Sequence, residues 1–487
     1  MKNTTKLTIL HNNDIHGDFI EEKIDDEYIG GLSLLSGYIN KVRDEEENVI
    51  YVIAGDMFRG SIIDSEFKGI STVEMINLLE PDIVTIGNHE IDYGIAHLLF
   101  IEKCATFPII NANLYIKSNH ANLFTPYKIL KIDGMKILFI GIVTDEVISA
   151  AKVDTLIGSF IDTREAATEI GRICNNYNSI DIDFTVVVTH IGVEKDIILA
   201  NLLDPDWGVD LIIGGHSHTF MAQPMTVNNI VIAHAGEGSD SIGRFDIVVD
   251  TDNNCIDSYE WSYVKITDKT IQRDIQMQQI IEKYKNITDE KYGRIITRFR
   301  KKLTHPLRQQ ETSLGNLFAD ILRESLGLDI MLLGSGSIRG QELGPIVDLG
   351  TLTEIFPYDD EIYMLKVNGE MLVRMIKKFV CADAFLGITE FYQLSQGLEV
   401  KYSKSTNEFE YIRFNGQDIQ EEDIFTIGVQ NFHYQNLEEF LNVSHAEVNE
   451  LFKPRVVTTS TLDILEEYLS VHRRLDRDIE GRILVVD

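Results

Sequence analysis

Residues 7–17 read LTILHNNDIHG, an apolar run that leads directly into a loop carrying Asp14 and His16. Four further segments follow the same plan: VIYVIAGDMFRGS (49–61), IVTIGNHEID (83–92), TVVVTHIG (185–192) and LIIGGHSHT (211–219). Short apolar runs rich in Ile and Val are typical of strands that are buried on both faces. The five segments therefore predict five such strands, each ending in a polar loop.

Longer stretches of mixed polarity separate several of these runs and predict helices, for example over 71–79 and 161–177. Strands that alternate with helices indicate an α/β domain built of packed layers. In sheets of this class, ligands gather at the carboxyl ends of the strands. We therefore expect the five polar loops to converge on one functional site.

Two pairs of residues in these loops indicate a metal site. Asp14 and His16 are separated by one residue, as are His216 and His218. On an extended segment, residues i and i+2 point to the same side, so each pair can approach one metal cluster. Carboxylate oxygen combined with imidazole nitrogen favours Zn, Mn, Fe or Co as the bound ion.

Asp56 and Asn88 supply the remaining oxygen donors. Asp56 offers two oxygens and could bridge two ions, whereas the neutral oxygen of Asn88 leaves the ions acidic enough to activate water. Several other histidines lack a comparable loop, and we expect ordinary core or surface roles for them: His11, His97, His120, His234, His305 and His433.

Taken in order, the motifs ILHNNDIHG, GDMFRGS, GNHEID, THIG and GGHSHT resemble the calcineurin-like metallophosphatase domain of the 5′-nucleotidase family, over about residues 5–245. The resemblance implies a four-layer β-sandwich flanked by helices, with two divalent metal ions. It assigns one metal to Asp14, His16, Asp56 and His218, and the other to Asp56, Asn88, His190 and His216. It also implies a catalytic histidine that is not a ligand, His89, oriented by Asp92.

This set of residues implies hydrolysis of a phosphoester, in which a hydroxide bridging the two ions attacks phosphorus in line with the leaving oxygen. A protonated His89 would stabilise the phosphoryl charge or protonate the leaving oxygen. Asp92 would fix the tautomer of this imidazole and favour its cationic form. A hydrogen bond that only stabilises the loop is an equally good role for Asp92 on sequence alone.

The sequence changes character around residues 265–300, where charged residues dominate and apolar residues are sparse but helically spaced. We expect a connecting helix or linker at 266–300. It would join a metallophosphatase domain at 1–265 to a second, smaller α/β domain at 301–487.

The second domain has its own predicted elements. Ser313 is expected to cap a helix that ends at Gly327. An apolar strand and turn follow in DIMLLGSGSIRG, and further strands are expected near 361–367 and 424–429.

Four segments of the second half resemble the substrate-binding C-terminal domain of the same family, over about residues 300–487: RQQETSLGNLFADIL, IMLLGSGSIRG, EIFPYDDEIYMLKVNG and GVQNFHYQNLEEFL. The resemblance implies that Tyr358 and Phe432 stack on the two faces of a nucleobase. Arg308 and Arg339 would donate to ribose or phosphate oxygens. Glu438 would accept from a sugar hydroxyl.

Two loops depart from the family pattern. The glycine-rich turn expected after the second aromatic residue is replaced by residues 436–439, reading NLEE, which limits how closely the backbone can approach a ligand. The NGGGIR-like turn reads GSGSIR at 334–339, so the usual Asn donor is missing. Simple packing therefore stays open as an alternative role for Tyr358 and Phe432.

The charge balance bears on partners and location. The chain has 44 basic and 77 acidic residues, so its formal net charge is −33. Such a field repels polyanions, which argues against a nucleic-acid polymer but not against a mononucleotide. The sequence shows neither a secretory signal nor a membrane-spanning run, and its four cysteines form no CxxC pair, so we expect a cytoplasmic protein with reduced thiols.

These features predict a two-metal phosphomonoester hydrolase, and most specifically a 5′-nucleotidase that releases phosphate from nucleoside monophosphates. A 2′,3′-cyclic-nucleotide phosphodiesterase and a nucleotide-sugar pyrophosphatase are alternatives with the same metal site. Outside enzymes, the alternative is a nucleotide-binding sensor, although binding alone does not require His89 beside two metals. The choice among Mn, Zn, Co and Fe, the preferred base and the oligomeric state stay open.

Overall fold

The structure is a computed structural model that describes residues 3–116, 118–144, 157–160, 162–177 and 182–486. The chain divides into two compact units, Met1–Thr288 and Asp289–Asp487. Each unit has its own hydrophobic cores.

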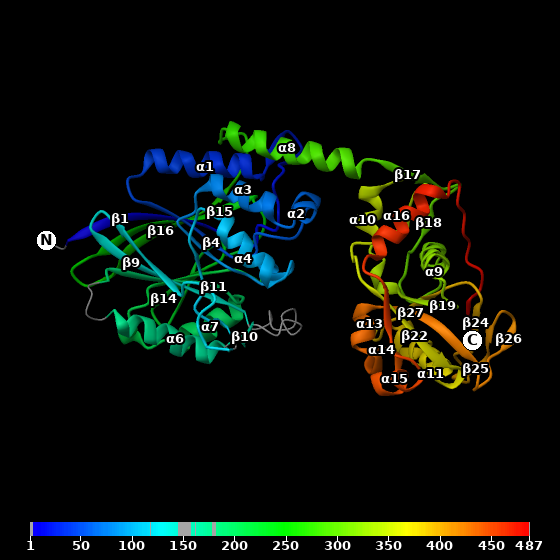
Figure 1. Ribbon diagram of the computed structural model, residues 1–487. Coiled ribbons are helices and arrows are strands. Elements are labelled where there is room, and N and C mark those ends of the chain that lie inside the picture. Colours follow the sequence, from blue (N-terminus) through cyan, green and yellow to red (C-terminus); the bar gives the residue numbers. More distant parts are fainter. Residues whose placement is uncertain (1–2, 117, 145–156, 161, 178–181, 487) are drawn as a thin grey trace. The chain divides into compact units, whose positions relative to one another are not determined.

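The first unit is built on two six-stranded sheets (Figure 1). In spatial order, the strands of the first sheet are β16 (Cys255–Lys265), β15 (Ser241–Asp250), β1 (Thr4–Asn12), β4 (Val49–Ala54), β5 (Ile83–Thr85) and β6 (Ile109–Ile110). Those of the second are β13 (Met225–Val227), β14 (Ile230–Ala233), β12 (Leu211–Gly214), β11 (Phe184–His190), β9 (Met135–Val143) and β8 (Tyr127–Ile132). Strands β1, β4, β5 and β6 are parallel, and so are β9, β11, β12 and β14.

The side chains of β4 show how the layers are built. Ile50 and Val52 pack in a core shared by the two sheets, whereas Tyr51 and Ile53 pack in a core shared with helices. Successive strand residues point to opposite faces, so a run that is apolar throughout is buried on both. This explains why β4 reads as a continuous apolar run.

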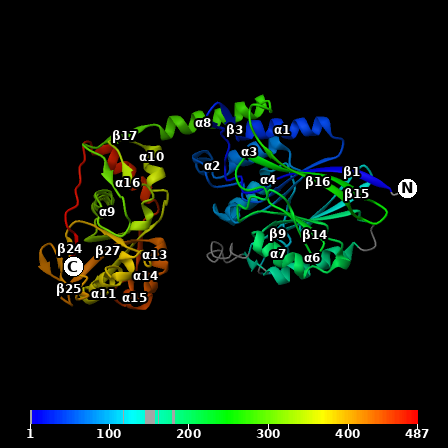
Figure 2. The same cartoon turned by 180° about the vertical axis from the view of Figure 1, so that it is seen from behind.

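Helices cover the outer faces of both sheets. Against the first sheet pack α1 (Leu32–Glu45), α3 (Ile70–Leu79), α4 (Ile95–Cys104) and α8 (Ile275–Tyr292). Against the second pack α6 (Thr163–Asn176) and α7 (Val193–Leu202). Figure 2 shows the same order of layers from behind. The result is a helix–sheet–sheet–helix stack, which confirms the α/β class and its four layers.

Short elements complete the first unit. They are the hairpin of β2 (Glu22–Ile24) and β3 (Glu27–Ile29), the pair β7 (Leu114–Ile116) and β10 (Ile157–Phe160), the helix α2 (Ile62–Phe67), and the 3₁₀ turns η1 (His89–Ile91) and η3 (Pro205–Trp207). Within the stretch expected to connect the domains, the helix α8 occupies Ile275–Tyr292. Residues Ile295–Arg298 of that stretch form a strand, β17, instead of helix.

The second unit is also α/β. Its five-stranded sheet has the order β23 (Tyr392–Leu394), β19 (Ile330–Gly334), β27 (Ile424–Gln430), β22 (Ile362–Asn368) and β28 (Arg455–Thr458). A four-stranded sheet has the order β26 (Gln417–Asp418), β25 (Glu408–Phe414), β24 (Leu398–Ser403) and β29 (Ile483–Val486). Two small pairs join β17 to β21 (Ile346–Asp348) and β18 (Leu303–Thr304) to β20 (Glu342–Leu343).

The helices of the second unit include α9 (Ser313–Leu326), α10 (Leu349–Ile355), α11 (Gly369–Phe379), α12 (Ala382–Phe385), α15 (His445–Leu451) and α16 (Thr461–Val471). Helix α9 ends as expected at Gly327, whose φ is 64°. Its cap is Thr312 and not Ser313, because the Thr312 hydroxyl accepts from the amide of Gly315. The Ser313 hydroxyl instead accepts from the amide of Thr304 on β18.

Among the described residues, none of the helices combines the length and the apolar character needed to cross a bilayer.

Candidate functional site

The polar loops after β1 and β4 lie against each other. The amides of Asp14 and His16 donate to the carbonyl oxygens of Gly55 and Asp56, each at 3.0 Å. Parallel pairing places the carboxyl ends of β1 and β4 side by side, so these bonds continue the contact beyond the strands. The two loops therefore pack against each other and position the side chains that they carry.

Most of the expected metal ligands have a backbone in the left-handed conformation. Five of the seven residues expected to bind metal have a positive φ between 49° and 84°: Asp14, His16, Asp56, His216 and His218. Residues other than glycine rarely adopt this conformation, which costs of order 1–3 kcal/mol each and concentrates at functional sites. Gly87 is required nearby, because a Cβ there would lie 2.1 Å from Oδ1 of Asp56.

The structure brings the expected ligand side chains together. Three groups of acidic and imidazole side chains have ligand atoms within 4.8 Å of one another: Asp14, His16 and His218; His16, Asp56 and His89; and Asp56, His190 and His216. Asn88 joins the last group, because its Oδ1 lies 2.8 Å from Nδ1 of His216. Asp56 and His16 are shared between groups, so the set is one continuous cluster with room for more than one ion.

Asp56 lies at the middle of the cluster and uses its two oxygens differently. Its Oδ1 accepts from the amide of His89 at 2.9 Å. Its Oδ2 lies 3.1 Å from Nε2 of His190 and 3.9 Å from Nε2 of His16. Burial opposes ionisation of Asp56, but the neighbouring His190 outweighs it and lowers the pKa of Asp56 to about 2.

The hydrogen-bond partners of His190 indicate whether its imidazole could bind a cation. Nδ1 of His190 lies 2.8 Å from the carbonyl oxygen of Ala54, which holds the proton on that nitrogen. The buried Nε2 of His190 makes no hydrogen bond with a described residue. Burial opposes protonation of His190, but the charge of Asp56 outweighs it and raises the pKa of His190 to about 9. A divalent cation held by the two side chains would take the place of that proton. The donor set therefore fits a metal centre.

The side chain of Glu90 connects two of the loops by hydrogen bonds. Its buried carboxylate accepts from the amides of Asp56, Met57 and Gly87 at 3.0, 2.7 and 2.6 Å. Burial, with the charge of Asp56, raises the pKa of Glu90 to about 7. One side chain thus fixes the backbone on both sides of Asp56 and just before Asn88.

His89 stands at the rim of the cluster. Its Nδ1 lies 2.7 Å from Oδ2 of Asp92, and this bond raises the pKa of His89. Its ring centre lies 5.3 Å from that of His16. The same Asp92 oxygen accepts from Nε of Arg59 at 2.8 Å. A protonated imidazole beside this cluster of candidate ligands could stabilise negative charge and donate a proton.

Three residues of this site were not singled out from the sequence. Glu90 and Arg59 lie inside quoted motifs, but polar residues in a loop are too common to identify a specific partner. Glu237 lies outside every motif, and its Oε2 lies 2.5 Å from Nδ1 of His218. No local signal connects Glu237 to His218, because the contact depends on how two loops pack.

In the second unit, contacts join some of the residues expected to bind substrate. The guanidinium of Arg339 lies over the ring of Tyr358, 4.9 Å from its centre, and donates to its hydroxyl. Burial raises the pKa of Glu390, and the positive charges of Arg308 and Arg339 oppose this shift only in part. The Glu390 carboxylate also accepts from the amide of Gly336 at 2.7 Å. Sequence reasoning missed Glu390.

Phe432 and Tyr358 are large aromatic side chains left exposed, with exposed fractions of 57% and 45%. The amide of Phe432 donates to Asp360, two residues beyond Tyr358, at 3.2 Å. This contact connects the loops that carry the two aromatic residues. Exposed rings on connected loops can bind a flat ligand.

The loop that departs from the family pattern is helical. Residues Asn431–Gln435 form α13 and Leu437–Leu441 form α14, with Asn436 between them. Glu438 is an exposed residue in the first turn of α14. Among the described residues, no hydrogen bond or ion pair joins its side chain to the other four expected substrate residues.

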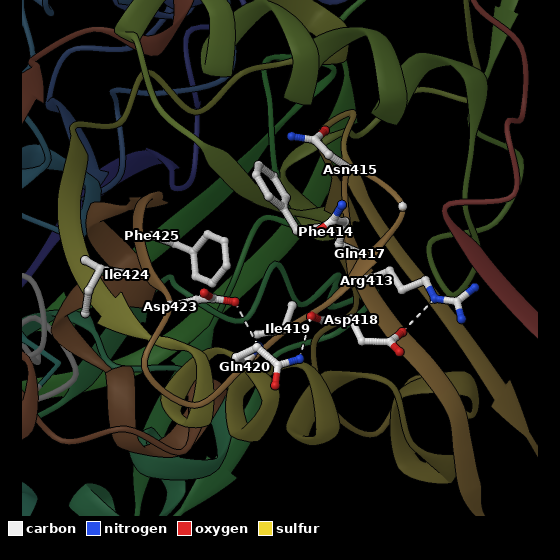
Figure 3. A pocket seen from close by; sticks show the side chains of 11 residues that line it. Arg413, Phe414, Asn415, Gln417, Asp418, Ile419, Gln420, Asp423, Ile424 and Phe425 are labelled. Carbon is white, nitrogen blue, oxygen red and sulfur yellow. Dashed lines mark hydrogen bonds and ion pairs between the residues drawn. The ribbon is translucent and has the colours of Figure 1, made fainter.

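A separate hollow of about 790 Å³ lies elsewhere in the second unit, between the β25–β26 turn and the start of β27 (Figure 3). Its charged groups are satisfied by one another or by backbone: Arg413 donates to Asp418 at 2.7 Å, and Asp423 accepts from the amide of Gln420 at 2.8 Å. Its lining shares no residue with the expected substrate site and contains no His or Cys. Its lining therefore offers neither an imidazole nor a thiol.

Comparison with known proteins identifies the two domains. Residues 7–220 match the family described as calcineurin-like phosphoesterase, and residues 291–443 match the 5′-nucleotidase C-terminal domain. The trifunctional nucleotide phosphoesterase protein YfkN of Bacillus subtilis is 27% identical over 76% of this chain, which spans 27% of that longer protein. The snake venom 5′-nucleotidase of Naja atra is 26% identical over 82% of this chain and 82% of its own length.

Among solved structures, the 5′-nucleotidase precursor from Thermus thermophilus has a TM-score of 0.67 and 21% identity, covering 99% of this chain and 100% of its own. At that identity, the likeness concerns the fold. The family matches confirm both expected domains in the expected order. The chain is thus a hydrolytic enzyme, and the calcineurin-like phosphoesterases that its first domain matches use divalent metals.

Proposed function

We propose that this chain, which joins a calcineurin-like phosphoesterase domain to a 5′-nucleotidase C-terminal domain, hydrolyses nucleoside 5′-monophosphates to nucleoside and phosphate. The observation that carries the proposal is the position of Asp56. Its Oδ2 lies 3.1 Å from Nε2 of His190 and 3.9 Å from Nε2 of His16, so that two groups of ligands meet at one carboxylate. A carboxylate shared by two ligand groups suits the two-metal site of a phosphoesterase.

The proposed ligands divide into two sets. One consists of Asp14, His16, Asp56 and His218, and the other of Asp56, Asn88, His190 and His216. When bound, two divalent ions supply Lewis-acid stabilisation of the phosphate and an acidic water. Mn, Zn, Co and Fe all suit these donors.

His89 is the proposed proton donor. The bond from Asp92 holds its Nδ1 proton and orients the ring, so that Nε2 is the atom that can donate to the leaving oxygen. Because the pKa of His89 is raised, the ring keeps its charge to a higher pH than an isolated histidine does. Its side chain is 37% exposed, which leaves it accessible to a substrate.

The second domain is proposed to hold the nucleoside. Tyr358 and Phe432 would stack on the base, at about 1–3 kcal/mol per stacked face. Arg308 and Arg339 would donate to ribose or phosphate oxygens, and Glu438 would accept from a sugar hydroxyl. The exposure of both aromatic rings supports this role over simple packing.

The test is a substrate panel of AMP, UMP, a 2′,3′-cyclic nucleotide and UDP-glucose, run with each of Mn, Zn, Co and Fe. A 5′-nucleotidase turns over the two monophosphates best. Preference for the cyclic diester or for UDP-glucose would instead identify a phosphodiesterase or a pyrophosphatase. Fewer than one bound ion per chain, with no turnover of any substrate, would favour a nucleotide sensor.

Two variants separate catalysis from recognition. His89→Ala should lower kcat about 10²- to 10⁴-fold while metal content is retained, and unchanged turnover of every phosphoester would overturn the assigned role. Phe432→Leu should raise KM for AMP while leaving hydrolysis of p-nitrophenyl phosphate, which has no base, unchanged. Phe220→Leu, at an exposed aromatic residue of the first unit, is the matched control.

A further inference from the structure

Arg59 is a cation built into the loop that follows β4. It lies three residues after Asp56, and its backbone is left-handed, with a φ of 66°. The backbone amide donates to Oδ2 of Asp64 at 2.9 Å, and the Asp64 side chain is completely buried. A non-glycine residue in this conformation persists only when its surroundings hold it there.

The guanidinium of Arg59 is held as firmly as the backbone. It lies over the ring of Tyr93, 5.5 Å from the ring centre, and the Tyr93 hydroxyl donates to the same Asp64 oxygen at 2.8 Å. On the other side, Nε donates to Oδ2 of Asp92 at 2.8 Å. A ring, a carboxylate and a fixed backbone thus give the guanidinium one position.

This position is next to His89. Oδ2 of Asp92 accepts from Nε of Arg59 and contacts Nδ1 of His89 at 2.7 Å, so the two cationic groups converge on one oxygen atom. Because His89 adjoins His16 of the metal cluster, Arg59 lies at the edge of the proposed reaction site.

Most of the donors of this guanidinium are unused. Arginine has five N–H donors, and Asp92 takes the one on Nε. Within the described parts of the chain, neither Nη atom has a hydrogen-bond acceptor, and the side chain is 47% exposed. Two Nη groups in a planar fork match the paired oxygens of a phosphate or a carboxylate. In a chain with a net charge of −33, a fixed cation at this place favours an anionic substrate.

We propose that Arg59 is a substrate-binding residue whose Nη groups donate to phosphate oxygens beside His89. The inference rests on the proposed function, since it takes a phosphate ester as substrate. The oxygens could belong to the phosphoryl group that is hydrolysed or to a second phosphate attached to it. Both sources share one chemistry, and inorganic phosphate and pyrophosphate distinguish them.

The experiment measures binding of the two anions to the full chain reconstituted with Mn²⁺, by calorimetry at equal metal content. Arg59→Gln should weaken binding of inorganic phosphate about 10- to 100-fold if the residue contacts the hydrolysed group. If it contacts a second phosphate, only pyrophosphate binding should weaken by that factor. Arg59→Lys, which keeps the charge but not the fork, should recover part of the loss.

Arg273→Gln is the matched control. Like Arg59, Arg273 bonds a carboxylate, Glu21 at 2.8 Å, and lies over a tyrosine ring, that of Tyr28 at 5.2 Å, but it lies at a different place in the first unit. Unlike the Nη atoms of Arg59, Nη2 of Arg273 donates to Glu21 and Asp268. Its loss should leave both anion affinities unchanged. If Arg59→Gln binds phosphate and pyrophosphate as tightly as the unaltered chain, the proposal is wrong and Arg59 only supports Asp92. This readout needs no nucleotide turnover, so it remains valid if the substrate panel contradicts the proposed 5′-nucleotidase activity.

Discussion

Nε2 of His16 lies 3.0 Å from Nε2 of His218, and each ring has an acceptor at its other nitrogen. The carbonyl oxygen of Phe58 accepts from Nδ1 of His16, and Glu237 accepts from Nδ1 of His218. In the neutral rings, both Nε2 atoms therefore carry lone pairs that face each other. Two lone pairs that face each other at this distance are an arrangement that a bound cation would satisfy.

Divalent metal should stabilise the chain, and His218→Ala should remove part of that effect. At a free metal concentration of about 100 times the dissociation constant, one site contributes about 2.7 kcal/mol. We expect the unaltered chain to gain thermal stability on addition of Mn²⁺ and His218→Ala to bind about one ion fewer by elemental analysis. His120→Ala, at an exposed histidine, should behave like the unaltered chain. Equal metal content in all three proteins would contradict the assignment of His218.

Glu237→Gln should weaken one metal site without removing it. A carboxylate at Nδ1 makes the imidazole a better ligand, and loss of such a partner typically lowers metal affinity about 10- to 100-fold. Calorimetric titration with Mn²⁺ should show one weakened site and one unchanged site. Glu260→Gln, an exposed residue on β16, serves as the control. Two unchanged sites in Glu237→Gln would show that the contact with His218 has no effect on the metal.

Glu90→Gln should destabilise the first unit and disturb the metal cluster together. Glutamine has one acceptor oxygen and would point an NH₂ group toward backbone N–H groups that now donate to a carboxylate. Leaving buried donors without acceptors costs about 1–3 kcal/mol. We expect a lower unfolding temperature for the metal-free chain and less metal bound at a fixed concentration. Glu45→Gln, at an exposed residue of α1, should change neither quantity. An unchanged unfolding temperature in Glu90→Gln would show that the Glu90 carboxylate does not stabilise the two loops.

His11 should make the chain less stable in acid. Burial, together with the charge of His234, lowers the pKa of His11 to about 3, and neither ring nitrogen has a partner among the described residues. Between pH 6.5 and about 3 the unfolded chain binds a proton that the folded chain does not. The contribution of neutral His11 to the free energy of unfolding is therefore fully present above pH 6.5, and it is lost as the pH falls through this window.

His11→Leu removes this titration. Between about pH 7 and about pH 4 the variant should lose less stability than the unaltered chain, by up to roughly 3 kcal/mol. Denaturant unfolding with a chelator present excludes the separate effect of metal release. His120→Leu provides the control with an exposed histidine. Equal slopes of stability against pH in His11→Leu and the unaltered chain would rule out a neutral buried His11.

The layered fold was predictable because its signals are local. Strand β4 appears in the sequence as an apolar run at 49–54, and the same six residues form the strand. The run is readable because each face of β4 packs against a different apolar layer, so no position needs a polar residue. The capping of α9 was less predictable, since Thr312 and Ser313 are equally good caps by type and only the position of Thr304 distinguishes them.

By itself, the sequence determined the α/β class, the order of the polar loops and the residue types that could meet at a metal. These follow from periodicity and from the chemistry of each side chain. Only the tertiary structure decided that Arg59 reaches Asp92, that Glu90 holds both loops and that Glu237 contacts His218. The physical reason is that such bonds join separate loops whose approach is set by the packing of the sheets beneath them. Left-handed backbone at Asp14 and Asp56, which aims the side chains of the cluster, is imposed by the same packing.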